Sequence, residues 1–270
     1  MKTSQNQEVI SMEEAVINHH IDLGNGEPLV FIHGFASKKE SWTHQFSLAE
    51  KYRIIAVDLR GHGESIITEG ISINQFAKDV IDLLDHLNIE KAHFCGLSMG
   101  GVIIQEIYKQ FPKRVKSMIL SNTTSVSLPS SLKFLSPNSF KNLETIDESF
   151  PIKEYQKAVA AKCVYNKSNT ALVEEVAKIG IDLKLETATK TIKQIYDVNY
   201  LPMLACAKVP ILVIGGAYDE ALPVFFAKQT YLATLRKADF VIIDKAGHMP
   251  NIECKEKYNE ILERFLRKVS

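Results

Sequence analysis

The sequence predicts an α/β fold: a mostly parallel, twisted sheet with helices on both faces and a helical lid insertion. Short apolar runs alternate with amphipathic stretches from residue 28 to 123, as in right-handed βαβ crossovers. The run at 28–33 is continuously apolar up to His33, which is typical of a strand buried on both faces of a parallel sheet. The pattern stops over 125–200 and then resumes. We therefore expect 1–124 and 201–270 to form the core and 125–200 the lid.

The first part of the chain alternates strand and helix patterns. Apolar runs of strand length occur, in chain order, at 28–33, at 52–58, at the start of 91–101 and at 115–121. Residues 72–88 place apolar side chains three and four positions apart, which predicts a helix. A polar stretch around Trp42 and Phe46 is compatible with a helix, and 8–23 with one or two antiparallel strands.

The second part begins with the break in this pattern. Loop signals and amphipathic helical stretches near 151–165, 169–180 and 186–196 fill the inserted section. Strands are expected at 209–215 and 239–244, and helices around 224–236 and 254–268. Long insertions in compact domains are usually functional, so we interpret this one as a lid over the strand ends. A purely structural helical subdomain is the alternative.

A serine lies in a glycine-rich turn at 96–100, which has the pattern Gly-x-Ser-x-Gly. A sharp turn between strand and helix would expose Ser98 and aim its hydroxyl away from the sheet. The tightness of such a turn explains glycine at positions 96 and 100. Because a serine hydroxyl is a weak nucleophile unless a base activates it, the rest of the chain has to supply that base.

The base and its orienting carboxylate are predicted at two other strand ends. His248 follows the last expected strand, and Asp219 follows the strand at 209–215. Carboxyl ends of parallel strands meet at one edge of a sheet, so both should lie near Ser98. The chain order Ser…Asp…His is the order of α/β-hydrolase triads. Glu220 is a rival carboxylate, one residue further along the loop.

An oxyanion hole requires two backbone donors aimed at the developing negative charge. The N–H of Met99, directly after Ser98, is one candidate. The other is the N–H of Phe35 in the loop after the strand at 28–33, where Gly34 lets the chain turn.

Several motifs together resemble the α/β-hydrolase superfamily. They are His33-Gly34-Phe35, Asp58-x-Arg60-Gly61-x-Gly63-x-Ser65, Gly96-x-Ser98-x-Gly100-Gly101, Asp219 and Gly247-His248. The resemblance covers the chain from about residue 20 to its end. The motifs are similar to the serine-nucleophile branch, which contains small carboxylesterases, enol-lactonases, C–C bond hydrolases and cofactor-free haloperoxidases. In that family an acidic residue and a proline often follow the histidine; here Glu253 is followed by Cys254.

The resemblance implies a carboxylic ester hydrolase of the carboxylesterase type, acting through an acyl-enzyme on a small-molecule ester or lactone. The same triad could instead serve C–C hydrolysis, acyl transfer or perhydrolysis, and a triad-bearing ligand receptor or signalling protein is a further alternative. No cofactor and no metal are required. Residues that could line an apolar substrate pocket are Trp42, Phe134, Phe140, Tyr165, Leu222 and Met249.

Composition excludes other classes of partner. The 270 residues carry 32 basic and 32 acidic side chains with no block of like charge, so nucleic acid and acidic membrane surfaces are not expected partners. No apolar run has the length of a membrane span, and the N-terminus has no apolar signal segment. Four scattered cysteines suggest reduced thiols and a cytoplasmic protein. The oligomeric state is not indicated.

Overall fold

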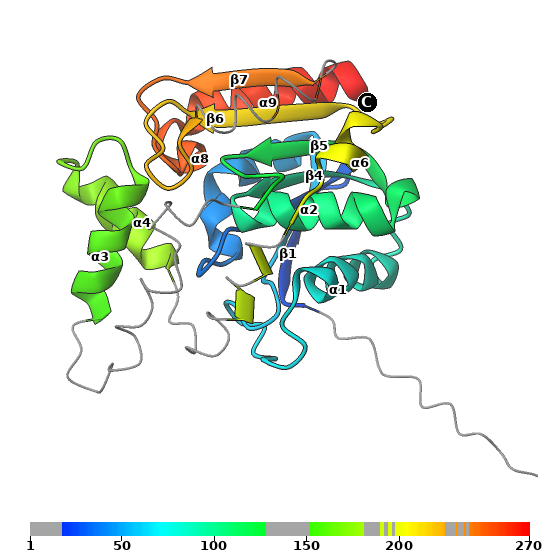
Figure 1. Ribbon diagram of the computed structural model, residues 1–270, viewed down its shortest axis with the longest axis horizontal. Helices are drawn as coiled ribbons and strands as arrows, with labels where there is room; N and C mark the ends of the chain where they lie inside the picture. The colour runs from blue at the N-terminus through cyan, green and yellow to red at the C-terminus, as the bar shows by residue number, and fades with distance from the viewer. Residues whose placement is uncertain are drawn as a thin grey trace, which may run out of the picture.

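Seven strands form a single sheet in the order β1-β3-β2-β4-β5-β6-β7 in the computed structural model (Figure 1). The structure describes residues 18–127, 152–180, 190–191, 194–195, 198–224, 231, 235 and 238–270. The strands are β1 (His20–Leu23), β2 (Glu27–Ile32), β3 (Tyr52–Val57), β4 (Ala92–Leu97), β5 (Val115–Ser121), β6 (Ile211–Gly216) and β7 (Asp239–Ile243). Only β1 pairs antiparallel, with β3, among these strands. The predicted mostly parallel sheet is confirmed.

Helices cover both faces of this sheet. One face carries α1 (Ile73–His86) and α2 (Met99–Gln110), and the other carries the 3-10 helix η1 (Lys39–Glu50) and α9 (Lys255–Val269) (Figure 1). Side chains alternate along β2, because Val30 and Ile32 pack on the α1 and α2 side while Leu29 and Phe31 pack on the other. This two-sided burial explains why residues 28–32 form a continuous apolar run.

The helix boundaries agree with the expected ones where residues are described. The Ser72 hydroxyl caps α1 by accepting the Gln75 N–H at 3.0 Å, so this helix begins where the apolar spacing does. The expected helix at 254–268 is preceded by a separate turn, α8 (Pro250–Glu253), and the backbone breaks at Cys254. Short helices η2 (Pro112–Arg114) and α6 (Leu201–Ala205) complete the core. Most of the helix expected at 224–236 lies outside the described residues.

The section between β5 and β6 contains two described helices, α3 (Ile152–Cys163) and α4 (Thr170–Ile179). They lie beyond the arrowheads of β5, β6 and β7, at the carboxyl ends of the parallel strands (Figure 1). The two ends of the section between β5 and β6, its stems, lie side by side. Val126 forms a β-bridge with Asn199, and the Tyr200 N–H donates to the Ser125 carbonyl at 2.7 Å. The section thus leaves and re-enters the core at one point. A lid role for it stays a prediction.

Among the helices in the described part of the chain, none is long and apolar enough to cross a membrane.

Candidate active site

Ser98 occupies a strained turn between β4 and α2. Its backbone has φ +55° and ψ −118°, a conformation that costs a non-glycine residue about 1–3 kcal/mol and persists only where its surroundings hold it. The Ser98 N–H donates to the Ser121 carbonyl at 2.9 Å, and the Thr123 hydroxyl donates to the Ser98 carbonyl at 2.6 Å. The end of β5 therefore holds the turn on both sides of the serine.

The glycines around Ser98 leave no room for side chains. A Cβ on Gly96 would overlap the backbone of Gly100, and a Cβ on Gly100 would overlap the carbonyl of Ile32. The first turn of α2 is therefore pressed against the strands β2 and β4. This close approach is the physical reason for the Gly-x-Ser-x-Gly pattern.

Asp219 lies in the turn after β6, and its side chain is fully buried. Its Oδ1 accepts the backbone N–H groups of Ala221 and Leu222, both at 2.8 Å. Its Oδ2 accepts the side-chain N–H of Asn122 at 2.7 Å and faces His248 Nδ1 at 2.8 Å. Four donors surround the two oxygens, so the orientation of this carboxylate is fixed.

His248 lies in the loop after β7, with its ring held by Asp219. Because the carboxylate oxygen accepts, the hydrogen bond assigns the proton of the neutral ring to Nδ1 and leaves the lone pair on Nε2. The backbone N–H of His248 donates to the carbonyl of Cys163 at 2.7 Å. The histidine is thus fixed from the core and from the inserted section together.

Asn122 links the serine turn to this pair, a role that the motifs did not indicate. It follows Ser121, whose carbonyl accepts the Ser98 N–H, and its backbone has a positive φ of 43°. Its amide donates to Asp219 and, at 3.2 Å, to the carbonyl of Gly247. The available signal was a polar residue directly after a buried parallel strand. Ser98, Asp219 and His248 therefore lie at the carboxyl ends of β4, β6 and β7, joined through Asn122.

The loop after β2 places Gly34 beside the serine, since a Cβ on Gly34 would lie 3.4 Å from Ser98 Cβ. The Leu59 N–H donates to His33 Nε2 at 3.1 Å, so His33 Nδ1 carries the proton and donates to the Gly34 carbonyl at 2.7 Å. Burial lowers the pKa of His33 to about 4, which keeps the ring neutral. The Gly34 carbonyl and the Phe35 N–H belong to the same trans peptide and point in opposite directions. The hydrogen bond from His33 to this carbonyl therefore also fixes the direction of the Phe35 N–H.

The second proposed oxyanion donor is the N–H of Met99. Met99 is the first residue of α2, where backbone N–H groups have no acceptor within the helix and the helix dipole is positive. The roles of Phe35 and Met99 as oxyanion donors stay predictions.

The expected pocket residues are not all brought together. Trp42 is fully buried in the core against Phe31 and near Tyr258, with ring centroids 4.7 and 6.3 Å away, and a place for it in the pocket lining stays a prediction. Leu222 lies three residues after Asp219 and is buried in the apolar cluster on the α1 and α2 side of the sheet. Met249 directly follows His248 and is buried in the cluster on the other side. Phe134 and Phe140 lie outside the described residues.

Tyr165 differs from the other expected pocket residues because it lies at the surface. It is 40 % exposed and its ring lies 4.4 Å from that of Tyr218. Tyr218 directly precedes Asp219, so Tyr165 does reach the rim of the site, although from outside.

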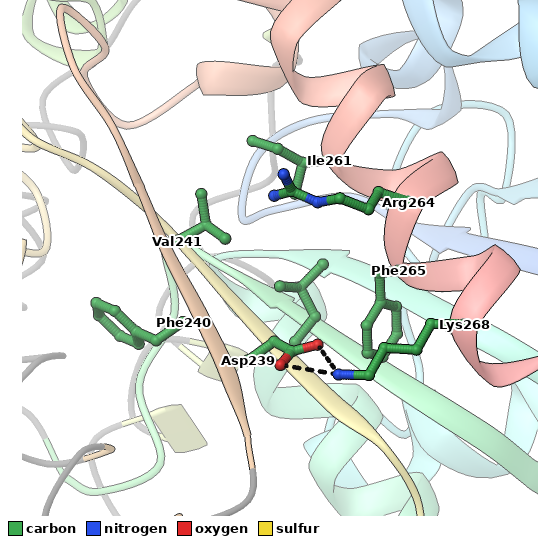
Figure 2. A pocket seen from close by; sticks show the side chains of 8 residues that line it. Asp239, Phe240, Val241, Ile261, Arg264, Phe265 and Lys268 are labelled. Carbon is green, nitrogen blue, oxygen red and sulfur yellow. Dashed lines mark hydrogen bonds and ion pairs between the residues drawn. The ribbon is translucent and has the colours of Figure 1, made fainter.

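A cavity of about 330 Å³ lies between β7 and α9, away from this rim (Figure 2). Lys268 spans it to reach Asp239, with Nζ 3.0 and 3.2 Å from the two carboxylate oxygens. Asp239 is the first residue of β7, whereas His248 follows the last one. The cavity therefore belongs to the opposite end of the strand and not to the serine site.

In the part of the chain that the structure describes, no group of three or more histidine, cysteine, aspartate or glutamate side chains is placed to hold a metal ion.

Comparison with known proteins gives the family. A profile of the alpha/beta hydrolase fold matches residues 27–254. The 3-oxoadipate enol-lactonase 1 of Acinetobacter baylyi is 26 % identical over 252 residues, covering 91 % of this chain and 90 % of the relative. The dihydrolipoyllysine-residue acetyltransferase component of the acetoin cleaving system of Pseudomonas putida is 29 % identical over 259 residues. That match covers 90 % of this chain, which spans only 64 % of the relative's length.

Solved structures share the fold. A thermophilic esterase from Thermogutta terrifontis superposes with a TM-score of 0.81 at 24 % identity, covering 93 % of both chains. At this identity the likeness concerns the fold alone. Together with the profile, which spans most of the sequence, it leads to one conclusion: the chain belongs to the alpha/beta hydrolase fold family.

Proposed function

We propose that the protein is a serine hydrolase that cleaves carboxylic esters, lactones among them, through an acyl-enzyme. The observation that carries this proposal is the Asp219–His248 hydrogen bond of 2.8 Å at the same sheet edge as the strained Ser98 turn. A weak nucleophile, a base with a fixed tautomer and an orienting carboxylate are the three parts that this chemistry requires. The family membership supports hydrolysis as the general reaction.

In the proposed reaction, His248 Nε2 takes the proton of Ser98 Oγ as Oγ attacks the ester carbonyl. Asp219 stabilises the imidazolium that forms. The N–H groups of Phe35 and Met99 donate to the oxyanion of the tetrahedral intermediate. The intermediate collapses as His248 returns its proton to the leaving alkoxide, which departs as the alcohol. His248 then activates water, which releases the acid from the acyl-enzyme. For a lactone, the alcohol and the acid are two ends of one product.

A small carboxylic ester or an enol-lactone is the substrate class that we propose. The names of two similar proteins support it, since one is an enol-lactonase and the other an esterase. The narrow link between the inserted section and the core is compatible with a cover over the strand ends.

The test is hydrolysis of 4-nitrophenyl esters by wild type, Ser98→Ala and the exposed control Ser47→Ala. Removing the nucleophile should lower kcat by at least about 10³-fold, the size of effect expected for a triad serine, whereas the control should keep its rate. A fluorophosphonate should add once to the wild type and not to Ser98→Ala, as read by intact mass. Equal rates or equal labelling in the two proteins would refute the assignment.

Acyl transfer to an acceptor other than water is the second candidate, because one relative is named as an acetyltransferase component. A competing alcohol, thiol or peroxide in the same assay separates the possibilities. If the acyl group passes only to water, the acid is the main product at every concentration of the added alcohol, thiol or peroxide. With a transferase, the acylated acceptor replaces the acid and the total turnover rises.

A further inference from the structure

The junction between α3 and α4, residues 163–167, lies directly on the loop that carries His248. The Cys163 carbonyl accepts the His248 N–H at 2.7 Å. The approach is so close that a Cβ on Gly247 would lie 2.6 Å from the Cys163 carbonyl oxygen and 3.0 Å from the Tyr165 nitrogen. Glycine at position 247 is therefore what lets the inserted section touch the histidine loop.

One carboxylate ties these two backbones together. Glu253 Oε1 accepts the N–H of Gly247 and Oε2 accepts the N–H of Tyr165, each at 2.7 Å. Both are charge-assisted hydrogen bonds, about twice as strong as neutral ones. Each oxygen serves a different segment, so the side chain acts as a bridge between the junction and the residue that precedes His248.

The junction also contacts the loop that carries Asp219. The Tyr165 ring packs on Tyr218, and Lys167 forms an ion pair with Glu220 at 2.6 Å. These contacts are exposed, and exposed ion pairs contribute little. The half-buried Glu253 carboxylate, with its two hydrogen bonds to backbone N–H groups, is the stronger connection between the inserted section and the site.

We propose that Glu253 is a positioning residue for His248, because its carboxylate holds the α3–α4 junction against the histidine loop. The position of the base therefore depends on the inserted helices and not on the core alone. The kinetic part of this inference rests on the proposed function of His248 as the general base. The structural part concerns only the Asp219–His248 hydrogen bond.

Glu253→Gln is the informative substitution, since a glutamine of the same shape would turn an NH₂ group toward one of the two N–H donors. One segment would then lose its acceptor and the histidine loop would shift. Because small misplacements at a reacting centre are costly, we expect kcat to fall about ten- to hundredfold while KM stays within about twofold. The control is Glu256→Gln, an exposed residue in the first turn of α9, which should leave both constants unchanged.

Gly247→Ala tests the same contact from the other side and serves also if Glu253→Gln fails to fold. Its Cβ would push the junction away and leave Glu253 intact. If both substitutions act on one contact, the double variant should lose little more kcat than the worse single variant. Losses that multiply would overturn the proposal, as would an unchanged kcat in both single variants.

A readout without turnover separates this inference from the proposed function. The His248 Nδ1–H in its hydrogen bond to Asp219 should give a downfield proton resonance, identified by its loss in His248→Gln. In a Ser98→Ala background, Glu253→Gln should shift or broaden this resonance and Glu256→Gln should not. A protein inactive on every ester would refute the proposed function yet leave this test intact. An unperturbed resonance in Glu253→Gln would refute the positioning role.

Discussion

The arrangement around Asp219 explains why this position needs a carboxylate. Two backbone N–H groups, one asparagine amide and the histidine ring all point hydrogen-bond donors at its oxygens. A carboxylate accepts in every direction, whereas an amide must direct its NH₂ group at one pair of these donors. An asparagine of the same shape at position 219 would therefore leave one pair of these donors without an acceptor.

Asp219→Asn should lower kcat on aryl esters by about 10³- to 10⁴-fold, because the histidine would no longer be held with its proton on Nδ1. The measurement is steady-state hydrolysis between pH 7 and 8. Glu220→Gln is the matched control, since Glu220 is exposed and pairs with Lys167 on the surface. A larger loss in Glu220→Gln than in Asp219→Asn would make Glu220 the orienting acid.

At the scale of the elements, the turn between β4 and α2 depends on backbone contact. The Ser98 conformation is unfavourable by itself, and β5 and β2 hold it through hydrogen bonds and close packing. Such strain persists only where neighbouring elements over-determine it. The conformation of the turn thus depends on β2, β4 and β5 together and not on the five residues of the Gly-x-Ser-x-Gly pattern alone.

Gly96→Ala should therefore destabilise the fold by about 1–3 kcal/mol, since its Cβ would overlap the Gly100 backbone and that backbone cannot rotate away. Urea unfolding measures the loss. Gly34→Ala is the comparison on the other side of Ser98, where a Cβ would make an ordinary contact of 3.4 Å. It should cost less than about 1 kcal/mol. Equal losses would contradict the role assigned to the packing of the turn.

The inserted section is likewise tied to the core at defined places. Its stems meet at Val126 and Asn199, and its α3–α4 junction is bound by Glu253. The first contact joins the two ends of the section to each other, and the second lies between its two described helices, next to the His248 loop.

At the scale of the whole molecule, the buried histidines make stability depend on pH. Burial lowers the pKa of His33 to about 4 and that of His62 to about 3, from an ordinary value of 6.5. The unfolded chain consequently binds more protons than the folded one between pH 6.5 and 4. The contribution of the neutral histidines to the free energy of unfolding is complete above pH 6.5. It falls as the pH drops through this window, by up to about 1.4 kcal/mol per pH unit for each histidine.

Urea unfolding of the whole protein at pH 7, 6 and 5 should show this decline. In His62→Gln the loss between pH 7 and 5 should be smaller, because one titrating group is gone, although the variant is less stable at pH 7. Burial acts to raise the pKa of Glu27, but hydrogen bonds, that from Lys116 first, outweigh it and lower the pKa to about 2, so this carboxylate affects stability below about pH 4.5, outside the measured range. A stability that rises toward pH 5 would contradict the neutral, buried state of these rings.

Much of the fold could be predicted because its signals are local. The parallel sheet, the helices α1 and α9 and the strand-end positions of Ser98, Asp219 and His248 follow from apolar runs, helical spacing and turn chemistry. These patterns reflect backbone geometry and burial, which act over a few residues. The shared edge of a parallel sheet then brings distant strand ends together without further information.

The sequence by itself determined the sheet, the Gly-x-Ser-x-Gly turn and the chain order of the three candidate residues. Only the tertiary structure decided that Asn122 joins them, that Glu253 links α3 and α4 to the His248 loop and that Trp42 lies in the core. The reason is that these are contacts between side chains and backbones far apart in the chain. No local period or turn preference encodes which distant partner a polar side chain meets, because packing of the complete molecule sets that distance.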